Sequence, residues 1–167
     1  FDRKEDIDGF VILDSNNDAN TWTYSDIGQK VGYSANANVA DDWLITPPVQ
    51  MNKGAIYKVT FNANNTYPVE RIEVALGPQP SAEGMTIRLI DPMEITVQNR
   101  NIPVSTFFRA TSDGIAYIGI HAISEANRGS IYIDNLSIIE IPVTAPESVS
   151  DFKVIPGAKG ANEAQIT

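Results

Sequence analysis

The sequence predicts an all-β protein built as a sandwich or a barrel. Short apolar or alternating segments recur along the chain, and clusters of Asn, Gly, Pro and Ser separate them. No segment keeps the period of 3.6 residues that an amphipathic helix requires. The content of 43% hydrophobic and 20% charged residues is typical of a folded globular domain.

The first half of the chain holds four of the predicted strands. Residues 10–13 are apolar and end at an Asp/Asn cluster. Residues 43–46 stop at a Pro-Pro pair, since proline has no N–H for a strand ladder. Residues 56–61 and 69–76 alternate between apolar and polar side chains, which indicates strands with one buried face.

The second half continues the same pattern. Strands are expected at residues 95–97, 104–108, 115–120 and 131–138, and the continuous apolar run at 115–120 predicts a strand buried on both faces. Residues 81–89 are expected to hold one helical turn at most.

A domain boundary is predicted near Pro142. Residues 143–148 have a linker-like composition, and residues 149–154 resemble one more strand before a tail of small residues. So short a segment cannot bury a core of its own. We therefore expect one domain over residues 1–142 and a linker with the first strand of a further module over 143–167.

The formal net charge of −9 limits the partners of the protein. An acidic surface repels phosphate backbones and anionic lipid heads, so nucleic acid and membrane surfaces are poor partners, while divalent cations are favoured. No apolar run is long enough to span a membrane. The chain has no cysteine and starts at Phe1, and we expect a mature or trimmed segment whose targeting signal has been removed.

Four segments, in order, resemble the choice-of-anchor J and cleaved-adhesin domains of bacterial surface proteins. They are the Asp-rich turn before a Trp at 14–22, Asp-Asp-Trp-Leu-Ile-Thr-Pro at 41–47, Tyr-Ile-Gly-Ile-His at 117–121, and Ile-Tyr-Ile-Asp-Asn-Leu at 131–136. The resemblance covers roughly residues 1–140. The chain departs from the pattern at Asn17 and Ala19, where many members carry Gly.

The resemblance implies a jelly-roll antiparallel β-sandwich of the galactose-binding-like type. Such domains recur in secreted or cell-surface bacterial adhesins and as accessory modules of secreted peptidases and glycoside hydrolases. Residues 145–167 are similar to the opening strand of a fibronectin type III module. Neither module defines a ligand by itself.

Asp14, Asn16 and Asp18 form the first candidate metal site. Oxygen ligands at alternate loop positions can converge on one hard cation, as in the EF-hand. An EF-hand is excluded because its sixth and twelfth positions would be Ala19 and Ser25. The alternative is a turn, since Asp and Asn hydrogen-bond their own backbone. The resemblance favours a structural calcium ion.

Asp134 is the second candidate, because it interrupts an apolar strand at 131–139. Facing inward, it would need a cation or backbone donors; facing outward, it would be solvated. The resemblance implies that an Asp in the last strand joins an acidic residue near the first strand at a calcium ion. Asp2 is placed to be that partner, or it is a solvated terminal residue.

Aromatic residues supply the candidate ligand-binding surface. Trp22 and Trp43 are expected in the core. Tyr24, Tyr33 and Tyr67 lie in polar, Gly/Asn-rich surroundings and are candidates for an exposed surface that stacks on sugar rings, with ordinary surface tyrosine as the alternative.

Nothing in the sequence favours an enzyme. His121 ends an apolar strand and no nucleophile motif accompanies it, while Glu70 and Glu73 are three apart on a strand and point to opposite faces. We therefore expect a non-catalytic binding or adhesion module that recognises a glycan or a host or cell-surface protein. The alternative is a structural spacer or accessory module that serves other domains of the parent chain.

Overall fold

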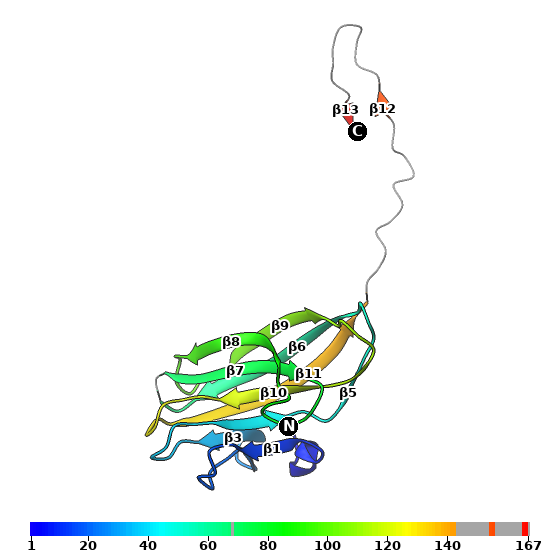
Figure 1. Ribbon diagram of the computed structural model, residues 1–167. Helices are drawn as coiled ribbons and strands as arrows, with labels where there is room; N and C mark the ends of the chain where they lie inside the picture. The colour runs from blue at the N-terminus through cyan, green and yellow to red at the C-terminus, as the bar shows by residue number, and fades with distance from the viewer. Residues whose placement is uncertain (68, 143–153, 156–164, 167) are drawn as a thin grey trace.

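The computed structural model describes residues 1–67, 69–142, 154–155 and 165–166. Within these residues the predicted antiparallel sandwich is confirmed, since two sheets lie face to face (Figure 1). A short 3-10 turn, η1 (Lys4–Ile7), precedes the first strand. No helical segment in the described residues is long and apolar enough to cross a membrane.

The larger sheet has six strands in the order β1-β4-β10-β7-β8, with β5 paired to β10. Every strand pair in it is antiparallel. Its strands are β1 (Val11–Asp14), β4 (Asp42–Ile45), β5 (Val49–Met51), β7 (Glu70–Gly77), β8 (Ile87–Ile95) and β10 (Gly114–Ala122).

The smaller sheet has five strands in the order β2-β3-β11-β6-β9. It is also antiparallel throughout, and β11 carries a bulge after Asp134. Its strands are β2 (Thr23–Ser25), β3 (Lys30–Ser34), β6 (Ile56–Asn65), β9 (Ile102–Arg109) and β11 (Ser130–Ile141).

A separate pair, β12 (Val154–Ile155) and β13 (Gln165–Ile166), follows further along the chain. The strand expected at 149–154 therefore lies, apart from its last residue, outside the described residues. The same holds for the predicted linker and for most of the fibronectin type III-like segment.

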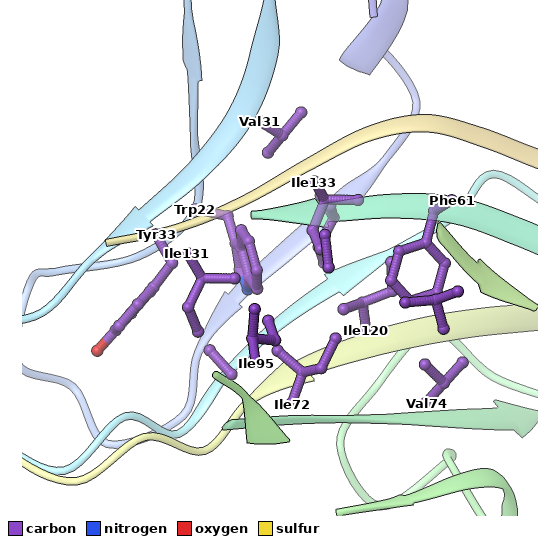
Figure 2. Packing of buried hydrophobic residues seen from close by; sticks show 14 of the residues in the cluster. Trp22, Val31, Tyr33, Phe61, Ile72, Val74, Ile95, Ile120, Ile131 and Ile133 are labelled. Atoms are coloured by element: carbon purple, nitrogen blue, oxygen red, sulfur yellow. The ribbon is translucent and has the colours of Figure 1, made fainter. Parts of the chain in front are cut away.

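The core lies between the two sheets (Figure 2). Trp22 and Tyr33 pack together with ring centroids 5.8 Å apart, and each side chain is only 1% exposed. The Trp22 indole nitrogen donates to the Asp42 carbonyl at 3.0 Å, so its one polar atom is satisfied. The prediction that Trp22 and Trp43 are core residues is confirmed.

The strand prediction is wrong in two respects, and the turn expected within residues 81–89 is followed by a strand that was not predicted. Strands β2, β3 and β5 are too short to show a period, and the sequence analysis missed them. Residues 81–89 form a turn closed by the bond from the Gly84 amide to the Ser81 carbonyl, followed by β8. The strand expected at 95–97 is only the end of β8. The proline inside β8, Pro92, is tolerated because β8 is an edge strand.

The outer face of the six-stranded sheet is covered by the turn between β7 and β8. Met85 of this turn and the Trp43 ring both lie against Gly119, where an added Cβ would be 2.7 Å from the Trp43 ring and 3.1 Å from the Met85 sulfur. Residues 118–120 are consequently buried on both sides, which confirms the expectation for the middle of this strand. Over β4 and the middle of β10, therefore, this face is covered, whereas Ile115 near the start of β10 is 56% exposed.

Candidate functional site

The outer face of the five-stranded sheet is the more open of the two. Along β6 every second residue is buried, so the alternate residues between Ile56 and Asn64 point outward. The strand ladder sets their neighbours: Lys58 lies between Ile139 of β11 and Phe107 of β9. In the same way Asn64 lies beside Tyr132.

Hydroxyl and amide groups occupy the middle of this face, where the Asp134 carboxylate of β11 also lies, opposite Asn62. Thr60 lies between Ser137 of β11 and Ser105 of β9, and Asn62 projects from the next outward position. Within the described part of the chain these four side chains have no hydrogen-bond partner. They are free to bond a polar ligand.

Two aromatic side chains mark the ends of this polar strip. Tyr132 lies directly over Gly32 of β3, where an added Cβ would be 2.9 Å from the ring. The Lys30 ammonium is 3.6 Å from the centroid of the Tyr132 ring. Phe107 is 59% exposed, and the Lys58 ammonium lies 5.5 Å from its ring centroid.

The strip has the length of an extended ligand. Six positions of β6 separate Asn64, beside Tyr132, from Lys58, beside Phe107, which corresponds to about 20 Å along the strand. Two aromatic surfaces with hydroxyl and amide groups between them suit a chain of polyhydroxylated rings. We call this set, Tyr132, Asn62, Thr60, Ser105, Ser137 and Phe107, the sheet-face strip.

Local sequence patterns do not single out the sheet-face strip as a whole, but they carry part of its signal. Tyr132 alternates with the buried Ile131 and Ile133, so it must face away from the core. The outward positions of β6 are polar for the same reason. Strand register decides that Tyr132, the outward residues of β6 and Phe107 belong to one strip, and alternation does not reveal the register.

The three tyrosines expected on a binding surface lie apart from one another. The expectation that Tyr33 is exposed is wrong, because its ring is buried against Trp22. Tyr24 is partly buried on the edge strand β2, opposite Val31. Tyr67 is 48% exposed in the loop between β6 and β7, and the Arg128 guanidinium lies 6.0 Å from its ring centroid.

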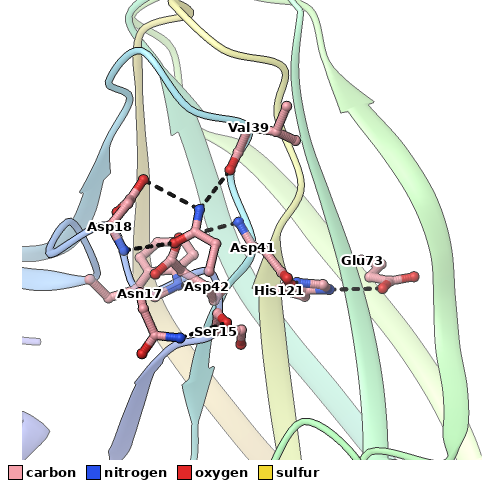
Figure 3. Close-up of polar contacts among 10 residues, drawn as sticks. Ser15, Asn17, Asp18, Val39, Asp41, Asp42, Glu73 and His121 are labelled. Carbon is pink, nitrogen blue, oxygen red and sulfur yellow. Dashed lines mark hydrogen bonds and ion pairs between the residues drawn. The ribbon is translucent and has the colours of Figure 1, made fainter.

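The Asp-rich turn brings Asp14, Asn16 and Asp18 together (Figure 3). The Asp14 carboxylate accepts from the amides of Asp18 and Ala19, at 3.1 and 2.9 Å, as the turn alternative predicts. Asn17 and Ala19 have positive φ angles of 56° and 62°, where Gly would be unstrained.

A second loop closes over this turn. The Asn36 and Asn38 amides donate to Asp18 at 2.8 and 3.0 Å, and Asn16 donates to the Val39 carbonyl at 2.8 Å. The Asn36 hydrogen bond in particular lowers the pKa of Asp18. Two carboxylates, three amide groups and one carbonyl are thus gathered at one place.

Carboxylate, side-chain amide and carbonyl groups are the kinds of group that supply oxygen ligands to calcium. Calcium takes six to eight oxygen ligands in irregular geometry, and an Asn side chain turned about its last bond presents oxygen in place of N–H. The acidic side chains are too few to hold an ion alone, since no three Asp, Glu, His or Cys side chains in the described residues converge as metal ligands. A cation here would depend on the amides.

Asp134 and Asp2 are not brought together. Asp134 Oδ1 accepts from the backbone nitrogens of Phe1 and Asn135, at 2.9 and 2.7 Å. Asp2 is exposed, and its backbone bonds to Asp6 and Gln29. Asp134 faces outward on β11 like Tyr132, with its side chain 27% exposed, and backbone donors bond one of its carboxylate oxygens.

His121 lies between two carboxylates that the sequence analysis did not connect with it (Figure 3). Its Nε2 is 2.7 Å from Asp41 and its Nδ1 is 2.9 Å from Glu73, while its ring stacks on Trp43 with centroids 4.0 Å apart. Both ring nitrogens are engaged, so neither is left for a hydroxyl nucleophile. Glu70 is buried on the other side of the sheet, as the spacing of Glu70 and Glu73 predicts.

A cavity of about 290 Å³ lies at the end of the sandwich where β5 approaches the turn between β9 and β10. Its wall includes Met51, Leu76, Phe108 and Ile115, and Asp113 is its one charged residue. It is more apolar than the sheet-face strip and suits a polyhydroxylated ligand less well.

Asp42 is a buried carboxyl group behind the Asp-rich turn. Its side chain is 0% exposed, and Oδ1 has no hydrogen-bond partner in the described residues. Burial raises the pKa of Asp42 to about 6, and the nearby charges of Asp14 and Asp18 act in the same direction.

No family model and no curated protein sequence matches the chain. Solved structures with a similar fold include the K1 cleaved adhesin domain of Lys-gingipain from Porphyromonas gingivalis W83, with 14% identity, a TM-score of 0.64, and coverage of 80% of this chain and 92% of that one. A CBM4 structure has 14% identity and a TM-score of 0.60 over 83% of this chain and 100% of that chain.

The N-terminal cellulose-binding domain of Cellulomonas fimi β-1,4-glucanase C is also similar, with 13% identity, a TM-score of 0.53, and coverage of 81% and 91%. The likeness confirms the jelly-roll sandwich and, at the level of fold, the resemblance to cleaved-adhesin domains.

The buried Asp42 makes stability depend on pH. In the unfolded chain Asp titrates near ~3.9, whereas in the folded chain the pKa of Asp42 is about 6. The stabilisation linked to this raised pKa is complete below the unfolded value and is lost as pH rises through the folded one. From pH 4 to pH 7, wild type should lose about 2–3 kcal/mol of its free energy of unfolding through Asp42. Asp42→Asn has no carboxyl group at this position and should not show this loss.

Urea denaturation in chelator-containing buffer at both pH values measures this difference. The exposed Asp26→Asn is the control and should show the same loss as wild type. A difference between Asp42→Asn and wild type that stays constant with pH would contradict the assignment.

Proposed function

We propose that this domain is a non-catalytic glycan-binding module of a secreted or surface-attached bacterial protein. The observation that carries the proposal is the sheet-face strip, in which the exposed Phe107 and the half-buried, outward-facing Tyr132 lie at the ends of a row of hydroxyl and amide groups. Aromatic faces bury large area on ligands at low entropy cost, and the groups between them can bond sugar hydroxyls.

The similar structures support this class of function. They include a bacterial adhesin domain and a cellulose-binding domain that share the sandwich. The arrangement around His121 supports a non-catalytic role, because its two nitrogens bond to carboxylates and a nucleophile has no place beside it.

The alternative function, a spacer or accessory module, predicts a different surface from that of a binding module. A spacer needs no free aromatic platform, and an exposed Phe on a sheet face adds a risk of aggregation without benefit. The exposed Phe107 therefore favours the binding module.

We also propose that the Asp-rich turn binds a structural calcium ion. Asp14 and Asp18 supply the charge, while Asn16, Asn36 and the Val39 carbonyl supply neutral oxygens. The ion would join the turn after β1 to the loop before β4. Asp14 and Asp134 each accept from two backbone nitrogens, so the preference for the turn rests on the second carboxylate, Asp18, and on the side-chain amides gathered around it.

Glycan binding should depend on the aromatic ends of the strip. We expect Tyr132→Ala and Phe107→Ala each to weaken binding at least about tenfold, which corresponds to about 1.4 kcal/mol. A glycan array followed by calorimetry on the best ligand measures the effect. Ile115→Ala, which removes an equally exposed apolar side chain elsewhere, is the control and should leave affinity unchanged.

Tyr67→Ala separates the sheet-face strip from the loop site that the sequence suggested. If Tyr67→Ala abolishes binding and Tyr132→Ala does not, the ligand binds at the loop end and the sheet-face strip is not the site. If the array shows no glycan bound at all, the proposed function is wrong.

Calcium should stabilise the folded state by mass action, by about 2.7 kcal/mol at a hundredfold excess over its dissociation constant. A chelator should lower the melting temperature, and calcium should restore it better than magnesium, which demands a tight octahedron. We expect Asp14→Ala to remove this response and Asp134→Ala to keep it. A melting temperature that ignores the chelator, with no metal found by elemental analysis, would leave the turn as a hydrogen-bonded structure only.

A further inference from the structure

Cations gather around the sheet-face strip. Lys30 lies over Tyr132, Lys58 lies beside Phe107, and Arg109 follows two residues after Phe107 on the same edge strand, where its guanidinium donates to the Gly54 carbonyl. These three residues belong to a protein with only 12 Lys and Arg against 21 Asp and Glu. Their placement on one face is therefore a local reversal of the overall charge.

Carboxylates are scarce on the same face. Among the residues that the structure describes, the one carboxylate within the strip is that of Asp134, which lies opposite Asn62 across the ladder with β6, and its Oδ1 already accepts from two backbone nitrogens. Glu140, at the end of β11, instead accepts from the Tyr57 hydroxyl and from Asn52. The acidic residues of η1 lie beside β2, at the edge of the sheet. Lys58 has only neutral neighbours across both ladders, Ile139 and Phe107.

The contact between Lys30 and Tyr132 distinguishes neutral from acidic ligands. The ammonium lies over the ring, at the place that a stacked sugar would take. A sugar must therefore move Lys30 aside, and a neutral sugar gives the ammonium no charge in return for the lost cation–π contact. A carboxylate or sulfate on the sugar instead offers the ammonium an ion pair that replaces the cation–π contact. The flexible lysine stem lets the ammonium follow the acidic group to the rim of the ring.

We propose that the ligand of the sheet-face strip is an anionic glycan, a chain whose sugar units carry carboxylate or sulfate groups. Tyr132 and Phe107 stack on the sugar rings, and Lys30 and Lys58 pair with the acidic groups near each end. The surrounding acidic surface repels polyanions in general. Only an anionic ligand that also stacks on the strip gains enough contacts to bind.

This inference rests on the proposed glycan-binding function, and its test separates the two. The full chain is titrated by calorimetry with oligogalacturonate, hyaluronan oligosaccharides and chondroitin sulfate oligosaccharides. Each is compared with its uncharged form, made by carboxyl reduction or desulfation, so that length and linkage stay constant. Neutral xylo- and cello-oligosaccharides complete the set.

We expect at least one acidic oligosaccharide to bind at least tenfold more tightly than its uncharged form. The Lys30→Gln/Lys58→Gln double variant should remove this preference and keep the residual binding of the uncharged form. Arg88→Gln, on β8 of the other sheet, removes an equal charge and should change affinity less than twofold. Its ion pair with Glu73 is more than half exposed at the arginine, so the fold should tolerate the change.

Each other outcome contradicts a defined part of the account. Equal binding of acidic and uncharged forms, or stronger binding of neutral oligosaccharides that Tyr132→Ala abolishes, overturns the anionic preference and leaves the glycan-binding function standing. Binding to none of these probes and to no other glycan overturns both.

Discussion

The turn between β7 and β8 covers the middle of one outer face of the sandwich, over β4 and β10, and the surface that remains available depends on this cover. Two glycines allow it: an added Cβ at Gly77 would lie 1.7 Å from the Gly84 carbonyl oxygen, a separation that no side chain can occupy. The chain then returns over the sheet, and Met85 and Trp43 pack at Gly119. Strand β4 is buried on both sides as a result. The five-stranded sheet has no comparable cover in the described residues, so its outward side chains remain free to meet a ligand.

Hydrogen bonds at the end of the sandwich that carries the Asp-rich turn fix the neighbouring loops. Asp18 receives amide donors from two loops, and Asp41 joins the loop before β4 to His121 of β10. Trp22 ties the same region to the core through the Asp42 carbonyl. These bonds fix the loops at one end of the sandwich, where Asp42 is a fully buried carboxyl group. The loop end thus serves mainly to secure the sandwich, while the sheet face presents aromatic, hydroxyl and amide groups with Lys30 and Lys58 beside them.

The sequence predicted the parts of the fold that local pattern determines. Alternation identified β6 and β7, the large apolar side chains of Trp22 and Trp43 indicated core, and the spacing of Glu70 and Glu73 placed them on opposite faces. Partners that come from distant segments could not be predicted in this way. The bonds from His121 to Asp41 and Glu73 join residues 80 and 48 positions away. Tyr33 has polar neighbours in sequence, yet β3 turns its ring into the core. Tyr132 and Phe107 become ends of one strip only because β6 lies between their strands.

The claim that the five-stranded sheet is the binding surface is tested most directly by mapping a bound oligosaccharide on backbone amides by NMR. The best ligand from the glycan screen is titrated into isotope-labelled protein, and the shift changes are assigned to residues. The account predicts changes concentrated on β3, β11, β6 and β9, around Tyr132, Asn62 and Phe107, with little effect at His121 or Trp43. Changes confined to the loops around Tyr67 and Arg128, or to the cavity beside Met51, would contradict it.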